Sequence, residues 1–300
     1  IANQGEPVNE IIFATGFSGI TDIEVGPDGM IYVVSIGDGT IYKISPSDQH
    51  VNLENQIPCN VKPGVKSKLS GCDLSGLSLQ NRQFTFQDLS NVNLSGSNLT
   101  GTSFLNSNLT GAIISGADMS NVDLTNAILT NAILQGTNIR DSQMYHTIFE
   151  GANLQNVKMT NSKLTDVNFN HANLTNADLS NTNLPYALIK NADLEGINLS
   201  FSNLNYALLI ESNLQGSDLS QTDIFLANFS GSDLSNSKIL GVYPHSTDFS
   251  NVIFSSETQT DSCLDTDNLS RFFNKLLREI RNTNLEFLKP FESLIVQICK

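Results

Sequence analysis

Four cysteines offer the clearest chemistry in this sequence. They form two pairs, one near each end of a long stretch without cysteine: Cys59 with Cys72, and Cys263 with Cys299. An even number of cysteines in such positions is typical of disulfides formed in an oxidising compartment. We therefore predict Cys59–Cys72 and Cys263–Cys299 bridges, with four unrelated reduced thiols as the alternative. No Cys-x-x-Cys or paired-His spacing indicates zinc.

The first residue, Ile1, and the cysteine placement bear on localisation. The sequence starts with neither a Met nor a hydrophobic signal segment, which is the pattern of a mature or truncated product. We expect an extracytoplasmic protein, secreted or at the cell surface, and keep a cytoplasmic location as the alternative.

Catalytic and cofactor chemistry is not indicated. His146 and His171 occupy turn positions on different corners, and the Asp and Glu residues are scattered. No Gly-rich phosphate loop, nucleophile elbow or Cys/His arrangement occurs. We expect no enzymatic activity, no catalytic residues, no cofactor and no metal site.

Asn-x-Ser/Thr sequences are a third kind of candidate site, for glycosylation of an exported chain. The same tripeptide is also the commonest form of the repeat described below, so its presence has a purely structural explanation. The candidate asparagines are Asn93, Asn98, Asn108, Asn173, Asn198, Asn228 and Asn268.

Composition narrows the class of protein. Of the 300 residues, 39% are hydrophobic and 15% are charged, and the formal net charge is −14. Such a chain is too apolar to be disordered, and its acidity argues against nucleic acid and anionic membranes as main partners. No apolar run approaches the roughly 18 residues of a membrane helix, so we expect no membrane insertion.

The elements that position these residues follow from a repeat of five. From Leu69 to Phe254, every fifth residue is large and apolar, with Pro244 as the exception. Two residues before each of these centres stands a residue that is mostly small or β-branched, as in Ala172-Asn173-Leu174. Positions two apart on an extended chain face the same way, so both point inward and the Asn or Asp between them points outward. The last two residues are turn formers, commonly ending in Gly or Asn, which tolerate positive φ.

This A(D/N)LXX pattern resembles the pentapeptide-repeat family, and the resemblance covers about 190 residues. It implies an all-β fold: a right-handed quadrilateral β-helix, a solenoid with four repeats per coil and a core without a cavity. Function would then lie on the outer faces, at the ends or in the attached segments. We divide the chain into a β segment at 1–50, a linker and cap at 51–66, the solenoid at 67–256 and an α-helical C-terminal cap at 257–300.

The two ends leave the repeat. Three apolar runs near the N-terminus predict strands at 20–25, 30–35 and 40–44, separated by Gly-Pro-Asp-Gly and Gly-Asp-Gly turns. This segment resembles one blade of a β-propeller of the sugar-dehydrogenase or NHL kind; since one blade cannot enclose a cofactor, no activity is carried over. Apolar residues from Leu269 to Ile280 follow helical spacing, and a second helix is predicted after Pro290.

The outer surface carries one unusual feature. If residues twenty apart stack, one corner collects apolar and aromatic side chains at outward positions, where the other corners are mainly polar. Monomeric proteins rarely expose such patches, so we predict an interface, with burial by the chain's own ends as the alternative. The predicted interface residues are Phe86, Leu105, Ile128, Tyr145, Ile148, Tyr186, Leu188, Tyr206, Leu208, Phe225 and Leu226.

These observations favour a non-enzymatic structural or protein-binding scaffold whose partner is another protein or a second protomer. Two alternatives remain open. One is an acidic DNA mimic that binds a topoisomerase, an activity known for some pentapeptide-repeat proteins. The other is the C-terminal part of a larger propeller-type sugar dehydrogenase.

Overall fold

The computed structural model describes the backbone of residues 20–25, 31–35 and 40–44, and residues 69–242, 244 and 246–260 in full. The chain divides into two compact units, Ile1–Leu69 and Ser70–Lys300. None of the described residues forms a helix with the length and hydrophobicity that crossing a bilayer requires.

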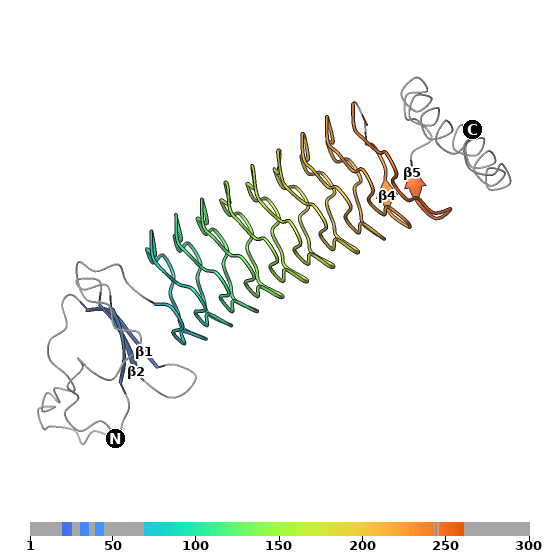
Figure 1. Ribbon diagram of the computed structural model, residues 1–300. Helices are drawn as coiled ribbons and strands as arrows, with labels where there is room; N and C mark the ends of the chain where they lie inside the picture. Colours follow the sequence, from blue (N-terminus) through green and yellow to red (C-terminus); the bar gives the residue numbers. More distant parts are fainter. Residues whose placement is uncertain are drawn as a thin grey trace, which may run out of the picture. The chain divides into compact units, whose positions relative to one another are not determined.

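The first unit contains a three-stranded antiparallel sheet in the order β1-β2-β3. Its strands are β1 (Ile20–Val25), β2 (Ile31–Ser35) and β3 (Thr40–Ile44), drawn in blue in Figure 1. Ser35 pairs with both Ile20 and Thr40, so each strand folds back on its neighbour. The strands predicted from the three apolar runs are thereby confirmed, with β2 starting one residue later than expected.

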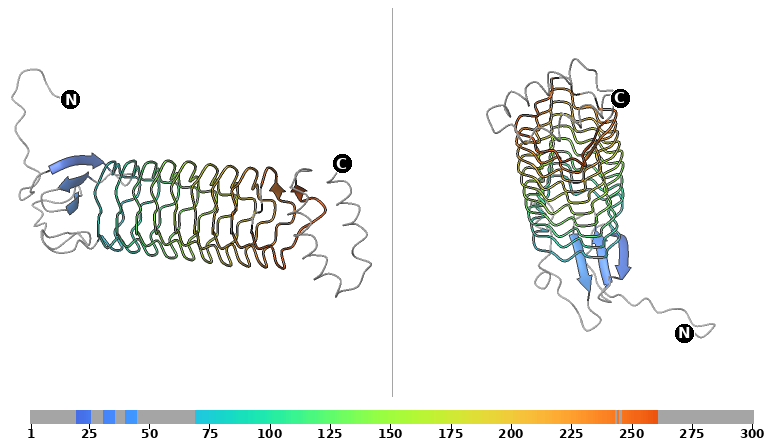
Figure 2. Two further views of the ribbon diagram at one scale, coloured as in Figure 1. Left: turned by 90° about the horizontal axis from the view of Figure 1, so that it is seen from above. Right: turned by 90° about the vertical axis from the view of Figure 1, so that its right-hand side faces the viewer.

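The second unit is a solenoid of stacked coils (Figures 1 and 2). Outward residues of the repeats form parallel bridges with the residue 20 positions later along almost the whole solenoid, beginning with Asp73 and Asn93. Two backbone bonds hold each bridge: Leu74 N donates to Asn93 O over 2.7 Å, and Asn93 N donates to Cys72 O over 2.7 Å. Four repeats per coil, which the resemblance to the pentapeptide-repeat family implied, are therefore confirmed.

Each coil turns at four corners, and one residue at every corner has left-handed backbone geometry. From Gly71 to Asn251, the second turn residue of each repeat has φ between 53° and 74°. Gly and Asn hold most of these positions because they adopt this region at the least cost. The amide of this residue donates to the coil above, as Gly76 N does to Ser95 O over 2.9 Å.

The core is a ladder of the central Leu, Ile, Met and Phe side chains, almost all with less than 3% of their surface exposed. Phe rings stack between successive coils, with Phe149 and Phe169 separated by 5.2 Å between ring centroids. Burial of this continuous apolar column stabilises the solenoid, since no single coil can bury its own centre.

Most buried hydroxyl groups fit this core because their hydrogen bonds are made internally; Ser217 Oγ is a buried hydroxyl without a partner among the described residues. Ser97 Oγ donates to Leu94 O within the same corner, and Thr102 Oγ1 donates to Leu79 O in the coil below, both over 2.7 Å. A buried polar group without such a partner would cost free energy of about 1–3 kcal/mol. Ser and Thr therefore substitute for Ala and Val at the inward position two residues before the centre.

The last coil changes the pattern. In earlier coils the amide of the central residue donates to the next coil, as Leu204 N does to Asp223 O over 2.7 Å. Pro244 occupies the equivalent position and has no amide hydrogen, so it cannot extend this edge. Strands β4 (Lys238–Ile239) and β5 (Gln259–Thr260) then pair in parallel with an offset of 21 residues rather than 20. Bridge pairing thus continues to Thr260, beyond the boundary expected at 256.

Several predictions fall on residues that the structure does not describe. Both C-terminal helices, the linker at 51–66, Asn268 and three of the four cysteines lie there. Cys72 is buried and disulfide-bonded, but its partner lies outside the described residues. The Cys59–Cys72 and Cys263–Cys299 pairings stay predictions.

Candidate binding surface

The 20-residue register places the predicted interface residues at one corner and on the edge that follows it. They occupy three neighbouring columns: the first turn position, the left-handed turn position and the next outward edge position. The edge column includes the bridged pairs Ile128–Ile148 and Leu188–Leu208. Because bridged residues are 20 positions apart, residues with this spacing lie in one column, and the three columns lie at one corner.

Polar residues divide the apolar side chains of this corner into groups. Asp166 and Asn168 occupy its left-handed and edge positions in a coil between the apolar groups. Phe86, whose amide donates to Leu105 O over 2.9 Å, lies next to Leu105 in a group near the start of the solenoid that also contains Ile128, Tyr145 and Ile148. The second group, which we call the aromatic corner, contains Tyr186, Leu188, Tyr206, Leu208, Phe225 and Leu226.

The aromatic corner is a packed cluster that spans three coils. The rings of Tyr186 and Tyr206 stack with their centroids 4.9 Å apart and their planes at 11°. Phe225 meets Tyr206 edge to face, with centroids 5.6 Å apart and an interplanar angle of 89°. Both are favourable aromatic geometries, so the side chains hold one another in place before any partner arrives.

These side chains remain open to solvent in the isolated chain. Tyr186 is 52% exposed and Tyr206 is 40% exposed, and Leu208, Phe225 and Leu226 are also classed as exposed. The described residues therefore do not bury the corner. Leaving a large apolar side chain in water forfeits roughly 1.5–3 kcal/mol relative to its burial.

The backbone adds a second cost at the same positions. Tyr186, Tyr206 and Leu226 all have left-handed φ values, of 63°, 63° and 56°. This conformation costs an ordinary residue roughly 1–2 kcal/mol, and Gly or Asn would avoid most of that cost. Three successive coils thus place large apolar residues where both backbone strain and exposure disfavour them.

A polar network fixes the backbone beside the cluster. Asn203 Nδ2 donates to Asn183 Oδ1 over 2.9 Å, and Asn205 Nδ2 donates to Asp223 Oδ2 over 2.8 Å. The amide of Phe225 donates to Asn205 Oδ1 over 2.8 Å. This network holds the backbone in place, and because the aromatic corner lies on the outside of the turns, it forms a convex ridge.

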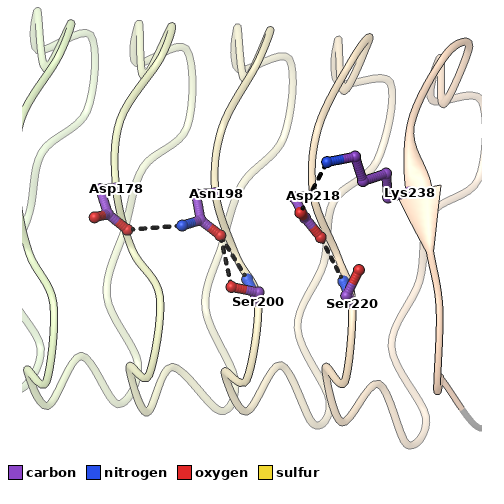
Figure 3. A network of polar contacts seen from close by, with 6 residues as sticks. All are labelled: Asp178, Asn198, Ser200, Asp218, Ser220 and Lys238. Carbon is purple, nitrogen blue, oxygen red and sulfur yellow. Dashed lines mark hydrogen bonds and ion pairs between the residues drawn. The ribbon is translucent and has the colours of Figure 1, made fainter.

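Another side of the solenoid shows the opposite character. We call it the polar face; Figure 3 shows part of it. Asn198 Nδ2 donates to Asp178 Oδ1 over 3.1 Å, and Asn198 Oδ1 accepts from Ser200 N and Oγ over 3.1 and 2.7 Å. The polar face consists of Ser78, Asn98, Asp118, Asn138, Lys158, Asp178, Asn198, Asp218 and Lys238.

Asp218 forms an ion pair with Lys238 at the C-terminal end of this ladder. Its Oδ2 lies 3.5 Å from Lys238 Nζ, and its Oδ1 accepts from Ser220 N over 2.9 Å. Partial burial raises the pKa of Asp218, but the Ser220 hydrogen bonds and the Lys238 charge together lower it below its ordinary value. The carboxylate thus stabilises the ladder in its charged form.

The candidate glycosylation asparagines within the solenoid are part of the same kind of ladder. Asn93, for example, accepts from Ser95 N over 3.1 Å and donates to Asp73 over 3.0 Å. Each of the other candidates also accepts a hydrogen bond from the backbone amide two residues later; they are Asn98, Asn108, Asn173, Asn198 and Asn228. Their side chains have a structural role whether or not they carry sugars.

Sequence reasoning gave too little weight to two features of the surface. Phe201 is 63% exposed in a left-handed turn on a different corner, with no other large apolar residue in its column. His146 Nδ1 lies 2.9 Å from Asp166 Oδ2, a pair that joins two coils beside the aromatic corner. The 20-residue spacing of these two residues could have revealed the pair. In the described part of the chain, no three His, Cys, Asp or Glu side chains are arranged to hold a metal ion.

Comparison with known families decides the identity of the repeat. Models of pentapeptide repeats match residues 67–104, 88–126, 192–231 and 202–239, and a model of a pentapeptide repeat region matches 122–199. Together these matches cover more than half of the chain. The chain belongs to the pentapeptide-repeat family. No curated protein matches it significantly.

Solved structures of pentapeptide-repeat proteins are similar to this chain. HetL from Nostoc sp. strain PCC 7120, involved in regulation of heterocyst differentiation, is 23% identical over 66% of this chain and 89% of its own, with a TM-score of 0.35. A thylakoid-lumen protein of Arabidopsis thaliana is 34% identical over 32% of this chain and 66% of its own, with a TM-score of 0.31. QnrB1, a plasmid-mediated fluoroquinolone resistance protein, is 16% identical over 68% and 99%, with a TM-score of 0.37.

Proposed function

We propose that this pentapeptide-repeat protein is a non-enzymatic scaffold that binds another protein through the aromatic corner. The observation that carries the proposal is the succession of Tyr186, Tyr206 and Leu226 in one column of left-handed turns. The fold accepts Gly or Asn there at lower cost, so the apolar side chains have no explanation in the stability of the solenoid. Burial against a partner would recover the free energy that exposure forfeits.

A different protein is a better candidate partner than a second protomer. The aromatic corner is a convex ridge only three coils long, and two convex ridges meet over a small area. Stable interfaces usually bury about 800 Å² on each partner. A partner with a complementary groove can surround the ridge and reach that area.

A capture experiment tests this function. The purified chain would be immobilised, exposed to an extract of its source organism, and compared with the Tyr186→Asn/Tyr206→Asn variant. Phe201→Asn is the matched control, because it also replaces an exposed aromatic residue in a left-handed turn. We expect the double variant to lose a bound protein that wild type and control both retain. Equal capture by all three would reject the aromatic corner as the binding surface.

Sedimentation of the isolated chain separates the two kinds of partner. A monomer at micromolar concentration agrees with a different protein as the partner. A dimer that the double variant dissociates and Phe201→Asn does not would instead assign the corner to self-association.

The acidic DNA-mimic hypothesis is less well supported by the charge distribution. Acidic residues lie on different edges of the solenoid, with Asp223, Asp233 and Asp218 in separate bridge columns, and Lys163 and Lys238 interrupt two of those columns. Mimicry would require carboxylates concentrated along one surface. Inhibition of gyrase supercoiling by the purified chain would favour this alternative over our proposal.

Export and the N-terminal blade are further parts of the proposal. The cysteine placement and the disulfide at Cys72 support an extracytoplasmic location. Peptide mapping without reduction should recover Cys59–Cys72 and Cys263–Cys299; four free thiols would contradict both pairings and the argument for export. The antiparallel order β1-β2-β3 is compatible with a propeller-type blade, and the sequence encoded upstream of Ile1 would test whether further blades precede it.

A further inference from the structure

One face of the Tyr186 ring is open. The near-parallel rings of Tyr186 and Tyr206 are 4.9 Å apart, close to the spacing of neighbouring strands, so they stack along the axis of the solenoid. One face of Tyr186 therefore lies against Tyr206, and its other face is directed toward the preceding coil. The greater exposure of Tyr186, at 52% against 40%, agrees with this arrangement.

Asp166 occupies the equivalent corner position in that preceding coil. Its amide donates to Pro185 O over 3.0 Å, which places its backbone directly below the turn that carries Tyr186. An aspartate side chain is much shorter than a tyrosine, so it leaves the outer part of the open ring face uncovered. An aromatic face and a carboxylate thus stand side by side on the corner.

The Asp166 carboxylate is itself accessible. Its side chain is 51% exposed, and Oδ2 lies 2.9 Å from His146 Nδ1. Within the described part of the chain, Oδ1 makes no hydrogen bond. One carboxylate oxygen is therefore available to a ligand, next to an open ring face.

We propose that Tyr186 and Asp166 together receive an arginine side chain of the partner protein. A guanidinium group stacks on an aromatic face and donates hydrogen bonds to a carboxylate in the same plane, which the ammonium group of lysine cannot do. Arg is also enriched among residues that dominate binding energy at interfaces. The net charge of −14 favours the approach of a basic segment. This inference rests on the proposed function and specifies the chemistry of the partner.

Nuclear magnetic resonance titration with N-acetyl-arginine amide tests the site without knowledge of the partner. N-acetyl-lysine amide and N-acetyl-glutamine amide, at matched ionic strength, are the comparison ligands. We expect the arginine derivative to shift the Tyr186 ring and Asp166 carboxyl resonances, the lysine derivative to shift them less, and the glutamine derivative to leave them unchanged. The Tyr186→Asn variant identifies the Tyr186 signals.

Asp166→Asn should reduce the arginine-induced shift of Tyr186 at least fivefold. Asp141→Asn is the matched control, because Asp141 also has a φ of 57° and also bonds a side chain one coil away, Asn161, over 3.3 Å. Asn is well tolerated in this conformation, so both variants should fold, as circular dichroism can check. Equal shifts with the glutamine derivative, or equal effects of the two variants, would overturn the proposal.

The capture experiment separates this inference from the proposed function. If Tyr186→Asn/Tyr206→Asn abolishes capture and Asp166→Asn weakens it at least threefold relative to Asp141→Asn, both hold. If the aromatic variant abolishes capture but Asp166→Asn behaves like its control, the corner binds a partner without an arginine at this position, and the inference fails alone. If the aromatic variant captures the partner normally, the proposed function fails.

Discussion

The polar face and the aromatic corner are built from the same repeat but use their outward side chains differently. On the polar face, Asn198 closes its own turn and bonds the coil below, so its side chain is explained by the fold. At the aromatic corner, the Tyr186 side chain is exposed, its backbone is left-handed, and its ring stacks on Tyr206. The comparison separates residues whose side chains stabilise the solenoid from residues whose side chains its stability does not require.

The largest effect is expected when the stacked tyrosines of the aromatic corner are replaced by Asn, a residue common at the turns of the other corners. Tyr186→Asn/Tyr206→Asn should weaken partner binding at least tenfold, because it removes the stacked pair, and should leave thermal stability unchanged or raised, because Asn relieves the left-handed strain. Binding is measured by capture and stability by thermal unfolding. A large fall in stability would show that the rings support the fold instead.

The reciprocal change on the polar face should lower stability and spare binding. Asn198→Ala removes the bonds to Ser200 and Asp178 and should cost about 1 kcal/mol in the free energy of unfolding. Leu208→Asn is the comparison variant at the aromatic corner. Asn168 and Asn228 already occupy the same column, so this substitution should not change stability. It should weaken binding, because it removes an apolar side chain from the proposed binding surface. Denaturant unfolding distinguishes the two. A stability loss confined to Leu208→Asn would reverse our assignment of roles.

Phe201 sharpens the comparison because it shares the strained backbone of Tyr186 but not its neighbours. Phe201→Asn should raise the free energy of unfolding by roughly 1 kcal/mol, through relief of the left-handed conformation. It should leave partner binding unchanged, as thermal unfolding and capture can show together. Loss of capture in this variant would extend the binding surface to a second corner.

The smallest expected effect is a difference in acid sensitivity on the polar face. Because the pKa of Asp218 is lowered in the folded chain, its stabilising contribution is fully present above its ordinary value, near pH 4, and is lost as the pH falls through the folded pKa. Asp218→Asn should therefore lose less stability than wild type between pH 5 and pH 2. Leu208→Asn, which changes no titratable group, should follow the wild-type curve. Equal acid sensitivity of Asp218→Asn and wild type would show that the carboxylate contributes nothing measurable.

The sequence predicted the solenoid well because its determinants are local and repeated. The spacing of the central residues from Leu69 to Phe254 revealed the repeat, and the resemblance to the pentapeptide-repeat family implied four repeats per coil and hence stacking every 20 residues. The Gly and Asn at turn positions indicated the left-handed corners. The strands at 20–25, 31–35 and 40–44 followed equally from apolar runs between Gly-rich turns.

Finer features depended on geometry that the repeat does not encode. The sequence placed Tyr186 and Tyr206 in one column but could not show that their rings stack or that Tyr186 keeps an open face. The offset between Lys238 and Gln259 arises after Ile253, which still pairs with Asp233 at the usual 20 residues, where the five-residue repeat ends. The importance of Asp166 emerged only when its place between His146 and Tyr186 was known.

Hydroxyl-radical footprinting of the chain, with and without its captured partner, tests the central claim most directly. Our account predicts that oxidation of Tyr186, Tyr206 and Phe225 falls at least fivefold in the complex, while oxidation of Phe86 and Phe201 is unchanged. Unaltered oxidation of the aromatic corner, or protection of Phe201 in its place, would contradict the claim that this corner is the binding surface.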